Sequence, residues 1–376
     1  MRKCEYAKYC GNCSLIDIDY PEQLQLKKNY VQDIFDNNNI DINIPTPIGM
    51  FFPYKYRNKV HLAIKKFKGK IIIGFYEEGS RRVVDIKSCL LHDTWLGKLI
   101  EIVRGFVTKY RIEPYDNDTR TGIIRYVVAR VIDGNIMCTI VTTTKNFAGR
   151  EYLYAKLSEA FKRVSLYVNV NSRSDKLVFD DKGFSFVKGE KYLQSNILGV
   201  KYQISPNSFL QVNLEICKAM YNRAMELMDI NTSDNIVDMY SGIGITSILF
   251  AKKCNKVVGI EYNKEATKNA EINKKLNNIA NLDIYTGTCG DVINNIDIGG
   301  YAKCFLDPAR SGAEPETINA IINSNIDRIV YMSCDPTTLA RDIKLLQKDF
   351  ILKSVECFDM FPHTNHIESI ALLVRK

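Results

Sequence analysis

The C-terminal half of the chain alternates short apolar runs with amphipathic helical patterns. Asn235–Met239 forms one apolar run, and Lys256–Glu261 forms the next after a glycine turn and a helical segment that begins near Ser247. Because parallel strands need a crossover between them, this alternation predicts an α/β fold with a doubly wound parallel sheet. We therefore expect residues 201–376 to form one Rossmann-like domain.

The turn between these two strands is typical of a nucleoside site. It has the sequence Tyr240-Ser-Gly242-Ile-Gly244, and Glu261 ends the second strand. Glycines let a ligand approach the backbone, and a carboxylate at the end of the second strand can hold both ribose hydroxyls. The third glycine of the dinucleotide fingerprint is missing. S-adenosylmethionine, which has no pyrophosphate, therefore fits this turn better than NAD does.

Cys334 stands between a predicted strand, Arg328–Met332, and a helix that Asp335 can cap and Pro336 can open. The N-terminus of a helix favours a thiolate over a thiol, which makes Cys334 a candidate nucleophile. A single cysteine of this kind is more often a small buried apolar side chain. The hypothesis therefore depends on the groups that surround it.

Two acids mark the ends of further predicted strands. Asp307 follows the apolar run Lys303–Leu306, and the ligands of parallel sheets bind at the carboxyl edge. Glu368 lies at the entry to a final strand that extends to Val374. Taken alone, a glutamate in such a place is more often a solvated loop residue than a catalytic one.

Three cysteines stand close together at the start of the chain, namely Cys4, Cys10 and Cys13. The glycine inside the C-x2-C pair lets the loop fold back, so that several thiolates can reach one metal centre. A fourth ligand is needed, and Cys89 is the nearest later cysteine. Spacing alone leaves zinc, a [4Fe–4S] cluster and unligated thiols open. The total of 11 cysteines is odd, which argues against a disulfide framework.

Residues 51–200 predict a mostly antiparallel α+β domain, with strands near 57–65, 70–76, 122–131, 135–142 and 166–170 and a hairpin turn at Lys68-Gly69. The first 200 residues hold 32 Lys and Arg against 22 Asp and Glu, whereas residues 201–376 hold 19 against 21. Basic and aromatic side chains alternate between Phe51 and Lys70. This pattern is typical of a groove for unstacked RNA, and a solvated lysine face is the alternative.

Taken together, these residues resemble the S-adenosylmethionine-dependent RNA uracil-5-methyltransferases, the family of the bacterial 23S rRNA and tRNA 5-methyluridine enzymes. The resemblance covers nearly the whole chain and rests on six ordered motifs, which are Cys4/Cys10/Cys13 with Cys89, Ser208-Phe-Leu-Gln211-Val-Asn, Asp238-Met-Tyr240-Ser-Gly-Ile-Gly, Leu306-Asp307-Pro, Ser333-Cys334-Asp-Pro and His366-Ile-Glu368.

The resemblance implies a role for each motif. Four residues would contact S-adenosylmethionine, namely Gln211, Tyr240, Glu261 and Asp307. Cys334 would add to C6 of uracil, and Glu368 would remove the proton from C5 after methyl transfer. The cysteines would hold a [4Fe–4S] cluster, with Cys4, Cys10, Cys13 and Cys89 as ligands. The target base must leave any helix to reach the thiol.

Some positions depart from the family pattern. Ala309 replaces the second proline of Leu-Asp-Pro-Pro-Arg, and Ser241 stands where cysteine is frequent. Because the chain begins at the cysteine motif, we expect it to lack the N-terminal β-barrel module of many relatives, which leaves residues 51–200 to bind RNA. The short form and the cysteines favour 23S rRNA as the substrate. A tRNA uridine-5-methyltransferase is the alternative, and an iron–sulfur oxidoreductase that binds a dinucleotide is a more distant one.

We therefore expect three domains. Residues 1–50 would carry the iron–sulfur cysteine motif and a helix opened by Pro21, residues 51–200 the α+β RNA-binding domain, and residues 201–376 the methyltransferase domain. The composition is that of a soluble globular protein, without a membrane span or the apolar core of a signal peptide. We expect a cytoplasmic, monomeric enzyme with ribosomal RNA as its partner and no association with membranes.

Overall fold

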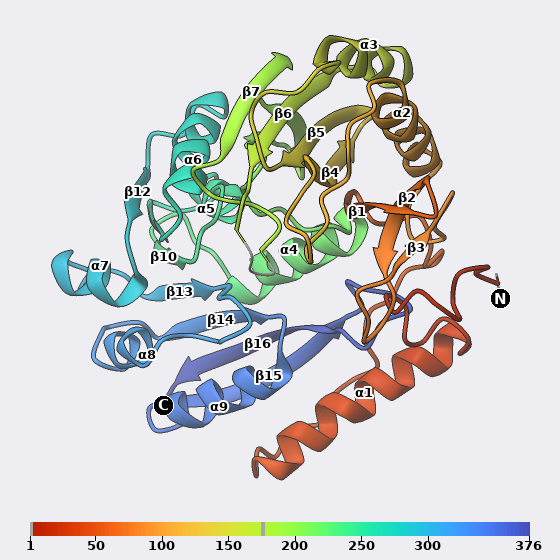
Figure 1. The fold of residues 1–376 in the computed structure, drawn as a ribbon. Coiled ribbons are helices and arrows are strands. Elements are labelled where there is room, and N and C mark those ends of the chain that lie inside the picture. Colours follow the sequence, from red (N-terminus) through yellow and green to blue (C-terminus); the bar gives the residue numbers. More distant parts are fainter. Residues whose placement is uncertain (1–2, 174–176) are drawn as a thin grey trace. The chain divides into compact units, whose positions relative to one another are not determined.

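The computed structural model describes residues 3–173 and 177–376 (Figure 1). It divides into two compact units. The first consists of Met1–Asp17, Pro53–Ser195 and Ser205–Asn207, and the second of Ile18–Phe52, Asn196–Ile204 and Ser208–Lys376. This division differs from the three expected domains, because the cysteine motif belongs to the first unit and the helix after it to the second. Within the described ranges, the helices are too short or too polar to cross a bilayer.

The first unit contains a mixed sheet with helices on one face. Its strand order is β3-β2-β1-β4-β5-β6-β7, and all neighbours are antiparallel except β5 and β6. The strands are β1 (Lys59–Phe67), β2 (Lys70–Tyr76), β3 (Val83–Asp85), β4 (Ile124–Ile132), β5 (Asn135–Thr142), β6 (Val164–Val170) and β7 (Phe184–Gly189). The helices are α2 (Trp95–Lys109) and α3 (Arg150–Ala160), whose apolar side chains share one core with the sheet.

The hairpin between β1 and β2 is closed by Lys68 and Gly69, as the sequence predicts. Phe67 pairs with Lys70, so the loop has two residues. Both loop residues have positive φ angles, 47° and 79°. Two-residue hairpin loops adopt this conformation because its twist matches that of the strands. The predicted antiparallel α+β character of this region is therefore confirmed.

The second unit is built on a sheet with the order β12-β11-β10-β13-β14-β16-β15. Its strands are β10 (Asn235–Met239), β11 (Lys256–Glu261), β12 (Leu282–Thr286), β13 (Lys303–Leu306), β14 (Arg328–Ser333), β15 (Phe350–Phe358) and β16 (Glu368–Arg375). Pairs from β12 to β14 are parallel, and β16 is antiparallel to β14 and β15. The predicted doubly wound sheet is confirmed, and an antiparallel pair extends one side.

Seven helices and the strand β9 (Val200–Ile204) complete the described part of the second unit. The helices are α1 (Tyr20–Asn37), α4 (Leu214–Met228), α5 (Ile245–Ala251), α6 (Lys264–Leu276), α7 (Cys289–Asn295), α8 (Pro315–Ile322) and α9 (Pro336–Leu346). A small separate sheet pairs β8 (Leu193–Ile197) with β9 (Val200–Ile204). Side chains of α1, α8 and α9 share one buried cluster with β13 and β14.

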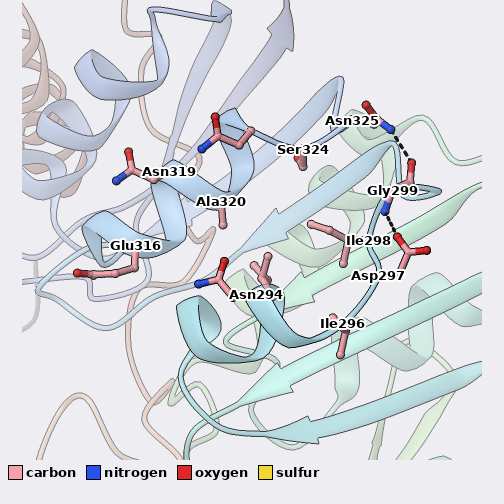
Figure 2. Close-up of a pocket in the computed structure, with 12 residues that line it drawn as sticks. Asn294, Ile296, Asp297, Ile298, Gly299, Glu316, Asn319, Ala320, Ser324 and Asn325 are labelled. Carbon is pink, nitrogen blue, oxygen red and sulfur yellow. Dashed lines mark hydrogen bonds between the residues drawn. The ribbon is translucent and has the colours of Figure 1, made fainter.

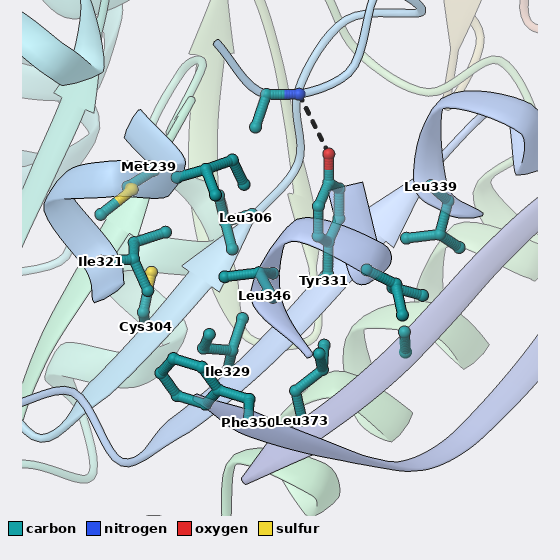
Figure 3. Close-up of a cluster of buried hydrophobic side chains, with 14 of the residues drawn as sticks. Met239, Cys304, Leu306, Ile321, Ile329, Tyr331, Leu339, Leu346, Phe350 and Leu373 are labelled. Atoms are coloured by element: carbon teal, nitrogen blue, oxygen red, sulfur yellow. Dashed lines mark hydrogen bonds between the residues drawn. The ribbon is translucent and has the colours of Figure 1, made fainter. Parts of the chain in front are cut away.

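Tyr331 anchors this core just before the strand β14 ends. It is fully buried, and its hydroxyl donates to Asp342 Oδ2 at 2.6 Å. The same hydroxyl accepts the backbone N–H of Ala313 at 3.1 Å, the bond drawn in Figure 3. The figure shows the apolar side chains that surround the ring, including Leu339 and Leu346 of α9. These contacts fix the end of β14 and the start of α9, between which Cys334 lies.

The topology places the predicted site residues at one edge of this sheet. The chain adds β11 and β12 on one side of β10 and then crosses back to add β13 and β14 on the other side. Such a reversal opens a crevice at the carboxyl ends of the strands, which is where ligands of open α/β sheets bind. Strand β16 runs in the opposite direction and begins at this edge. The edge therefore collects the residues that follow β10, β11, β13 and β14 and those that begin β16.

Candidate active site

Cys334 lies in the turn between β14 and α9, and the predicted cap of the helix is present. Asp335 Oδ1 accepts the backbone N–H groups of Thr337 at 2.9 Å and Thr338 at 3.2 Å, and Pro336 opens the helix. Ser333 Oγ accepts the N–H of Asp335 at 3.2 Å. The turn is therefore held on both sides of the half-buried cysteine.

The pairing of β14 with β16 brings Cys334 and Glu368 together. Met332 is paired with Ile370, and Ser333 with Ser369. Strand β14 ends at Ser333 and β16 begins at Glu368, so Cys334 and Glu368 follow directly on the last pair of the ladder. The charge of Glu368 contributes to the raised pKa of the Cys334 thiol, so the candidate nucleophile and the candidate base lie close together.

Glu368 and Asp307 are acids in a poorly solvated place. Glu368 is 3% exposed, and burial raises its pKa to about 8, with a further increase from the charge of Asp307. Burial raises the pKa of Asp307 to about 7, and the charges of Asp238 and Glu261 add to this effect. Perturbed carboxyl groups gathered in this way are typical of functional sites.

The thiol of Cys334 has a raised pKa, which corrects the expectation that the helix N-terminus makes it a thiolate. Its pKa is about 11, first because of burial and then because of the charges of Glu368 and Asp307. Burial penalises the charged form, and two carboxylates nearby repel a thiolate. In the protein alone these effects outweigh the end of the helix, so Cys334 carries its proton.

Arg310 is a cation at this edge that the sequence analysis named only as part of a motif. Its charge lowers the pKa of both Cys334 and Glu368. Its Nη2 lies 3.5 Å from both ring nitrogens of His366, and its backbone oxygen accepts the hydroxyl of Thr338 at 3.3 Å. In the sequence, its position three residues after Asp307 is the one feature that indicates a place near the site.

The glycine turn after β10 is shaped around a carboxylate. Tyr240, Gly242 and Gly244 all have positive φ angles, 65°, 57° and 80°. Glu261 Oε2 accepts the backbone N–H of Gly242 at 2.9 Å, and its Oε1 accepts the N–H of Asn263 at 2.7 Å. The acid at the end of β11 is therefore held beside the turn, as expected. A left-handed φ is strained for tyrosine, and such strain is found mainly at functional sites.

Asp238 is a buried acid that the sequence analysis gave no role. Its Oδ2 accepts the hydroxyls of Thr246 at 2.7 Å and Ser247 at 2.5 Å. Its Oδ1 is buried and has no hydrogen-bond partner among the described residues. Burial raises its pKa to about 7. With Glu261, Asp307 and Glu368 it gives this edge four carboxyl groups, against the one cation Arg310 that acts on Cys334 and Glu368.

Gln211 is buried between β9 and α4 in the second unit. The next polar residue, Asn213, caps α4 by accepting the N–H of Ile216 at 3.4 Å. Its amide also donates to the backbone oxygen of Met360 at 3.2 Å. The segment that carries Gln211 is therefore bonded to the loop that leads to Glu368. The hydroxyl of Tyr240, which is also an expected ligand-binding residue, lies 3.5 Å from Thr317 Oγ1.

Helix α1 holds the loop that precedes Glu368. Lys27 Nζ donates to Asp359 Oδ1 at 2.5 Å, and both side chains are almost fully buried. The hydroxyl of Tyr20 donates to the other oxygen of Asp359 at 2.8 Å. Gln23 Nε2 lies 3.0 Å from His363 Nδ1, and its Oε1 accepts the N–H of His363 at 2.9 Å. The start of β16 is thereby tied to a helix far away in the sequence.

The four predicted cysteine ligands lie in the first unit and influence one another. All are half-buried. Burial is the main cause of the raised pKa of Cys13, about 12, and of Cys89, about 11, and neighbouring thiols contribute to both. The hydroxyl of Tyr6 accepts the N–H of Lys87 at 3.0 Å, which joins the N-terminal motif to the Cys89 loop. Among the described residues, however, no three His, Cys, Asp or Glu side chains have an arrangement that holds a metal.

A cavity of about 510 Å³ in the second unit lies away from these residues (Figure 2). It is lined by the end of α7, by α8 and by the loops that precede β13 and β14. Asn325 Nδ2 donates to the backbone oxygen of Gly299, and the N–H of Gly299 donates to Asp297, both at 2.8 Å. The cavity is thus at the amino ends of the strands, and the predicted site residues do not line it.

Comparison with known proteins identifies the family. Residues 19–376 match the family model of tRNA (uracil-5-)-methyltransferases. An uncharacterized RNA methyltransferase of Clostridium tetani is 34% identical over 377 residues, which cover 98% of this chain and 82% of the relative. A protein of the same description from Halalkalibacterium halodurans is 34% identical over 381 residues, with coverages of 99% and 83%.

A solved structure with the same fold belongs to the tRNA (uracil-54, C5)-methyltransferase of Pyrococcus abyssi in complex with S-adenosyl-L-homocysteine. The TM-score is 0.82 at 27% sequence identity, and the match covers 100% of this chain and 87% of that one. The family match spans nearly all of the sequence, including each motif of the second unit's carboxyl edge. The chain therefore belongs to the RNA uracil-5-methyltransferase family and is an S-adenosylmethionine-dependent RNA methyltransferase.

Proposed function

We propose that this enzyme methylates C5 of a uridine in 23S rRNA through a covalent adduct between Cys334 and C6 of the uracil. One observation carries the mechanism. The β14–β16 register places Cys334 and Glu368 directly after the last pair of the ladder, Ser333 with Ser369, and the charge of Glu368 acts on the thiol of Cys334. A uracil ring that presents C6 to the thiol would present the neighbouring C5 to the carboxylate.

Cys334 and Glu368 act at different steps of the proposed reaction. The thiol of Cys334 first releases its proton to solvent; its sulfur then forms a bond to C6, and the electron pair of the C5–C6 double bond moves toward C5 and the carbonyl, which makes C5 nucleophilic. S-adenosylmethionine, when bound, supplies the methyl group from a positively charged sulfonium. Glu368 then takes the proton from C5, the double bond re-forms, and the C6–S bond breaks to release the thiolate.

The raised pKa values suit such a sequence. A base with a pKa of about 8 is near the working pH, which is where a general base is most effective. A cationic ligand beside Asp307 and Glu261 would offset their charges and lower the pKa of Cys334 and Glu368. Arg310 acts in the same direction. The thiolate would therefore form mainly when the site is filled.

S-adenosylmethionine would be held by Gln211, Tyr240, Glu261 and Asp307. The support for Tyr240, Glu261 and Asp307 is their place at the carboxyl edge, on both sides of the point where the strand order reverses. Gln211 is buried in the segment before α4, and Asn213 of that segment is bonded to Met360 in the loop before Glu368. Glu261 is fixed against the glycine turn and could accept ribose hydroxyls, while Asp307 at the end of β13 adds negative charge for a cationic ligand.

Ribosomal RNA is the first candidate substrate, and the N-terminal cysteines support this choice. Transfer RNA is the second candidate, supported by the Pyrococcus abyssi enzyme, whose described substrate position is uracil 54 of tRNA. We also propose a [4Fe–4S] cluster on Cys4, Cys10, Cys13 and Cys89, supported by the half-buried position of these cysteines and by the hydrogen bond from Lys87 to Tyr6 that joins the two segments. The thiols of the described structure are not arranged to hold a metal, so the loops would have to close around the cluster. Such a cluster would connect the N-terminal motif to the Cys89 loop.

The substrate is tested by supplying labelled S-adenosylmethionine with unmodified 23S rRNA or tRNA transcripts and identifying the labelled nucleoside. Label in 5-methyluridine from 23S rRNA alone supports the proposal, and label from tRNA alone replaces it with the second candidate. Label in another nucleoside, or in neither RNA, contradicts it. Cys334→Ala should abolish the label, and Cys254→Ser serves as a matched control outside the site.

The cluster is tested separately on protein purified without oxygen. Iron content near four atoms per chain, with visible absorption, would support it. Cys89→Ser should lose iron, whereas Cys254→Ser should keep it. Wild-type protein that carries zinc, or no metal after anaerobic reconstitution, would contradict the proposal.

A further inference from the structure

Three asparagines recur at four-residue intervals along α6 and its C-terminal cap, namely Asn269, Asn273 and Asn277. Residues four apart lie on the same face of a helix. Asn269 and Asn273 are almost fully buried, at 1% and 0% exposure. Asparagine is unfavourable inside helices, because its amide competes with the backbone for hydrogen bonds. A buried row of asparagines therefore indicates that their amides bind something outside the helix.

The amides of Asn273 and Asn277 bind the backbone of β9 as a neighbouring strand would. Asn277 Oδ1 accepts the N–H of Lys201 at 3.0 Å, and its Nδ2 donates to the backbone oxygen of Lys201 at 2.7 Å. Asn273 Oδ1 accepts the N–H of Gln203 at 2.8 Å, and its Nδ2 donates to the backbone oxygen of Gln203 at 3.3 Å. Four helical residues rise about 6 Å and two strand residues about 6.8 Å, so the two spacings match. The two amides therefore close the edge of β9 that does not pair with β8.

Asn273 makes one further bond that closing this edge does not require. Its Nδ2 also donates to the backbone oxygen of Ile243 at 2.9 Å, and Ile243 lies between Gly242 and Gly244 in the turn after β10. The additional bond of Asn277 Nδ2, at 2.7 Å, is instead to the backbone oxygen of Asn273 within α6 itself. Of these two side chains, Asn273 is the one that is bonded to the glycine turn.

The glycine turn is thereby held on both sides of the Gly242–Ile243 peptide. Glu261 accepts the N–H of Gly242, and Asn273 donates to the oxygen of Ile243. The peptide between these two groups cannot rotate without breaking one of the bonds. Glycine by itself permits many backbone conformations, and Gly242 and Gly244 both have left-handed φ angles here. The bond from Asn273 therefore selects one conformation of a turn that its glycines leave flexible.

We propose that Asn273 is a positioning residue for S-adenosylmethionine, which preorganises the glycine turn and couples it to β9. It acts through the carbonyl of Ile243 rather than by contact with the ligand. A turn that already has its bound conformation loses less conformational entropy on binding, so the affinity is higher. This role rests on the proposed place of S-adenosylmethionine at the glycine turn. Asn277, which has the same side chain and binds the same strand, would serve only the edge of β9.

The test compares Asn273→Ala with Asn277→Ala by calorimetric titration of the full-length protein with S-adenosyl-L-homocysteine. Asn273→Ala should weaken binding about tenfold, which corresponds to the loss of about one net hydrogen bond. Asn277→Ala is the matched control and should keep the wild-type affinity, although both variants should melt at a lower temperature. With the RNA that is methylated, Asn273→Ala should raise the KM for S-adenosylmethionine and leave kcat unchanged. Equal affinities of the two variants for S-adenosyl-L-homocysteine would overturn the positioning role.

Glu261→Ala separates failure of this role from failure of the proposed ligand site. If Glu261→Ala weakens binding and Asn273→Ala does not, the positioning role fails and the proposed site stands. If the wild type binds and neither variant changes the affinity, the proposed site at the glycine turn fails as well. Should Asn273→Ala not fold, hydrogen exchange of the wild type decides. Bound S-adenosyl-L-homocysteine should slow exchange at Lys201 and Gln203 together with the glycine turn, and unchanged exchange in β9 would overturn the coupling.

Discussion

Replacing Glu368 by glutamine should make the protein more stable, and increasingly so as the pH rises. Glutamine has the same shape but no charge. In the folded protein the pKa of Glu368 rises from 4.5 to about 8. At 1.36 kcal/mol for each tenfold change in proton affinity, the ionised carboxylate would cost the folded state about 4 to 5 kcal/mol. Relaxation of the site and coupling to Asp307 reduce this cost, so we expect Glu368→Gln to raise the free energy of unfolding at high pH by about 2 to 4 kcal/mol.

The sign follows from linkage. A folded state with the higher pKa binds the proton more tightly, so the wild type loses stability as the pH rises from 4.5 through about 8. Glu368→Gln should match the wild type in free energy of unfolding near pH 4.5 and exceed it above pH 8. The assay is urea unfolding at both pH values. The exposed Glu316, replaced by glutamine, is the control that should show no pH-dependent difference. A Glu368→Gln variant that is less stable than the wild type at high pH, or a difference independent of pH, would refute the argument from burial.

Three further predictions concern the same unit. Lys27→Met should lower the free energy of unfolding by about 3 to 5 kcal/mol, because it leaves Asp359 buried without its cation. The double variant Lys27→Met with Asp359→Leu should have a free energy of unfolding close to that of the wild type. Equal losses in the single and the double variant would contradict this prediction. Glu368→Gln should accumulate an RNA–protein adduct that survives denaturing electrophoresis, and adding Cys334→Ala should remove it; an adduct that persists would exclude this cysteine as the nucleophile. Arg310→Gln should move the pH midpoint of the single-turnover rate upward, since Arg310 lowers the pKa of Glu368; an unchanged midpoint would count against that role.

The elements that carry the chemistry could be predicted because their signals are local. The cap at Asp335 and the proline after it define the start of α9 within a few residues. The apolar runs gave the bounds of β10 and β11, and the Lys68-Gly69 turn gave the β1–β2 hairpin. Periodicity, capping and turn chemistry act over a few residues, so they can be recognised in the sequence without knowledge of the fold.

The sequence did not predict the ionisation of the site. It indicated a thiolate at Cys334, whereas the pKa of the thiol is raised. The reason is that pKa depends on solvent exclusion and on charges brought in from other strands, here Glu368 and Asp307. The role of Asp238 was missed for the same reason, because its unpaired oxygen is visible only once the strand is buried.

By itself, the sequence determined the parallel sheet, the glycine turn, the candidate nucleophile and the candidate base. Only the tertiary structure decided that Cys334 and Glu368 are neighbours, through the β14–β16 register, and that α1 holds the loop before Glu368 through Lys27 and Asp359. The physical reason is that residue type and spacing fix local conformation, whereas strand pairing and the burial of charged groups depend on contacts between segments that are not adjacent in the sequence, as with Lys27 and Asp359.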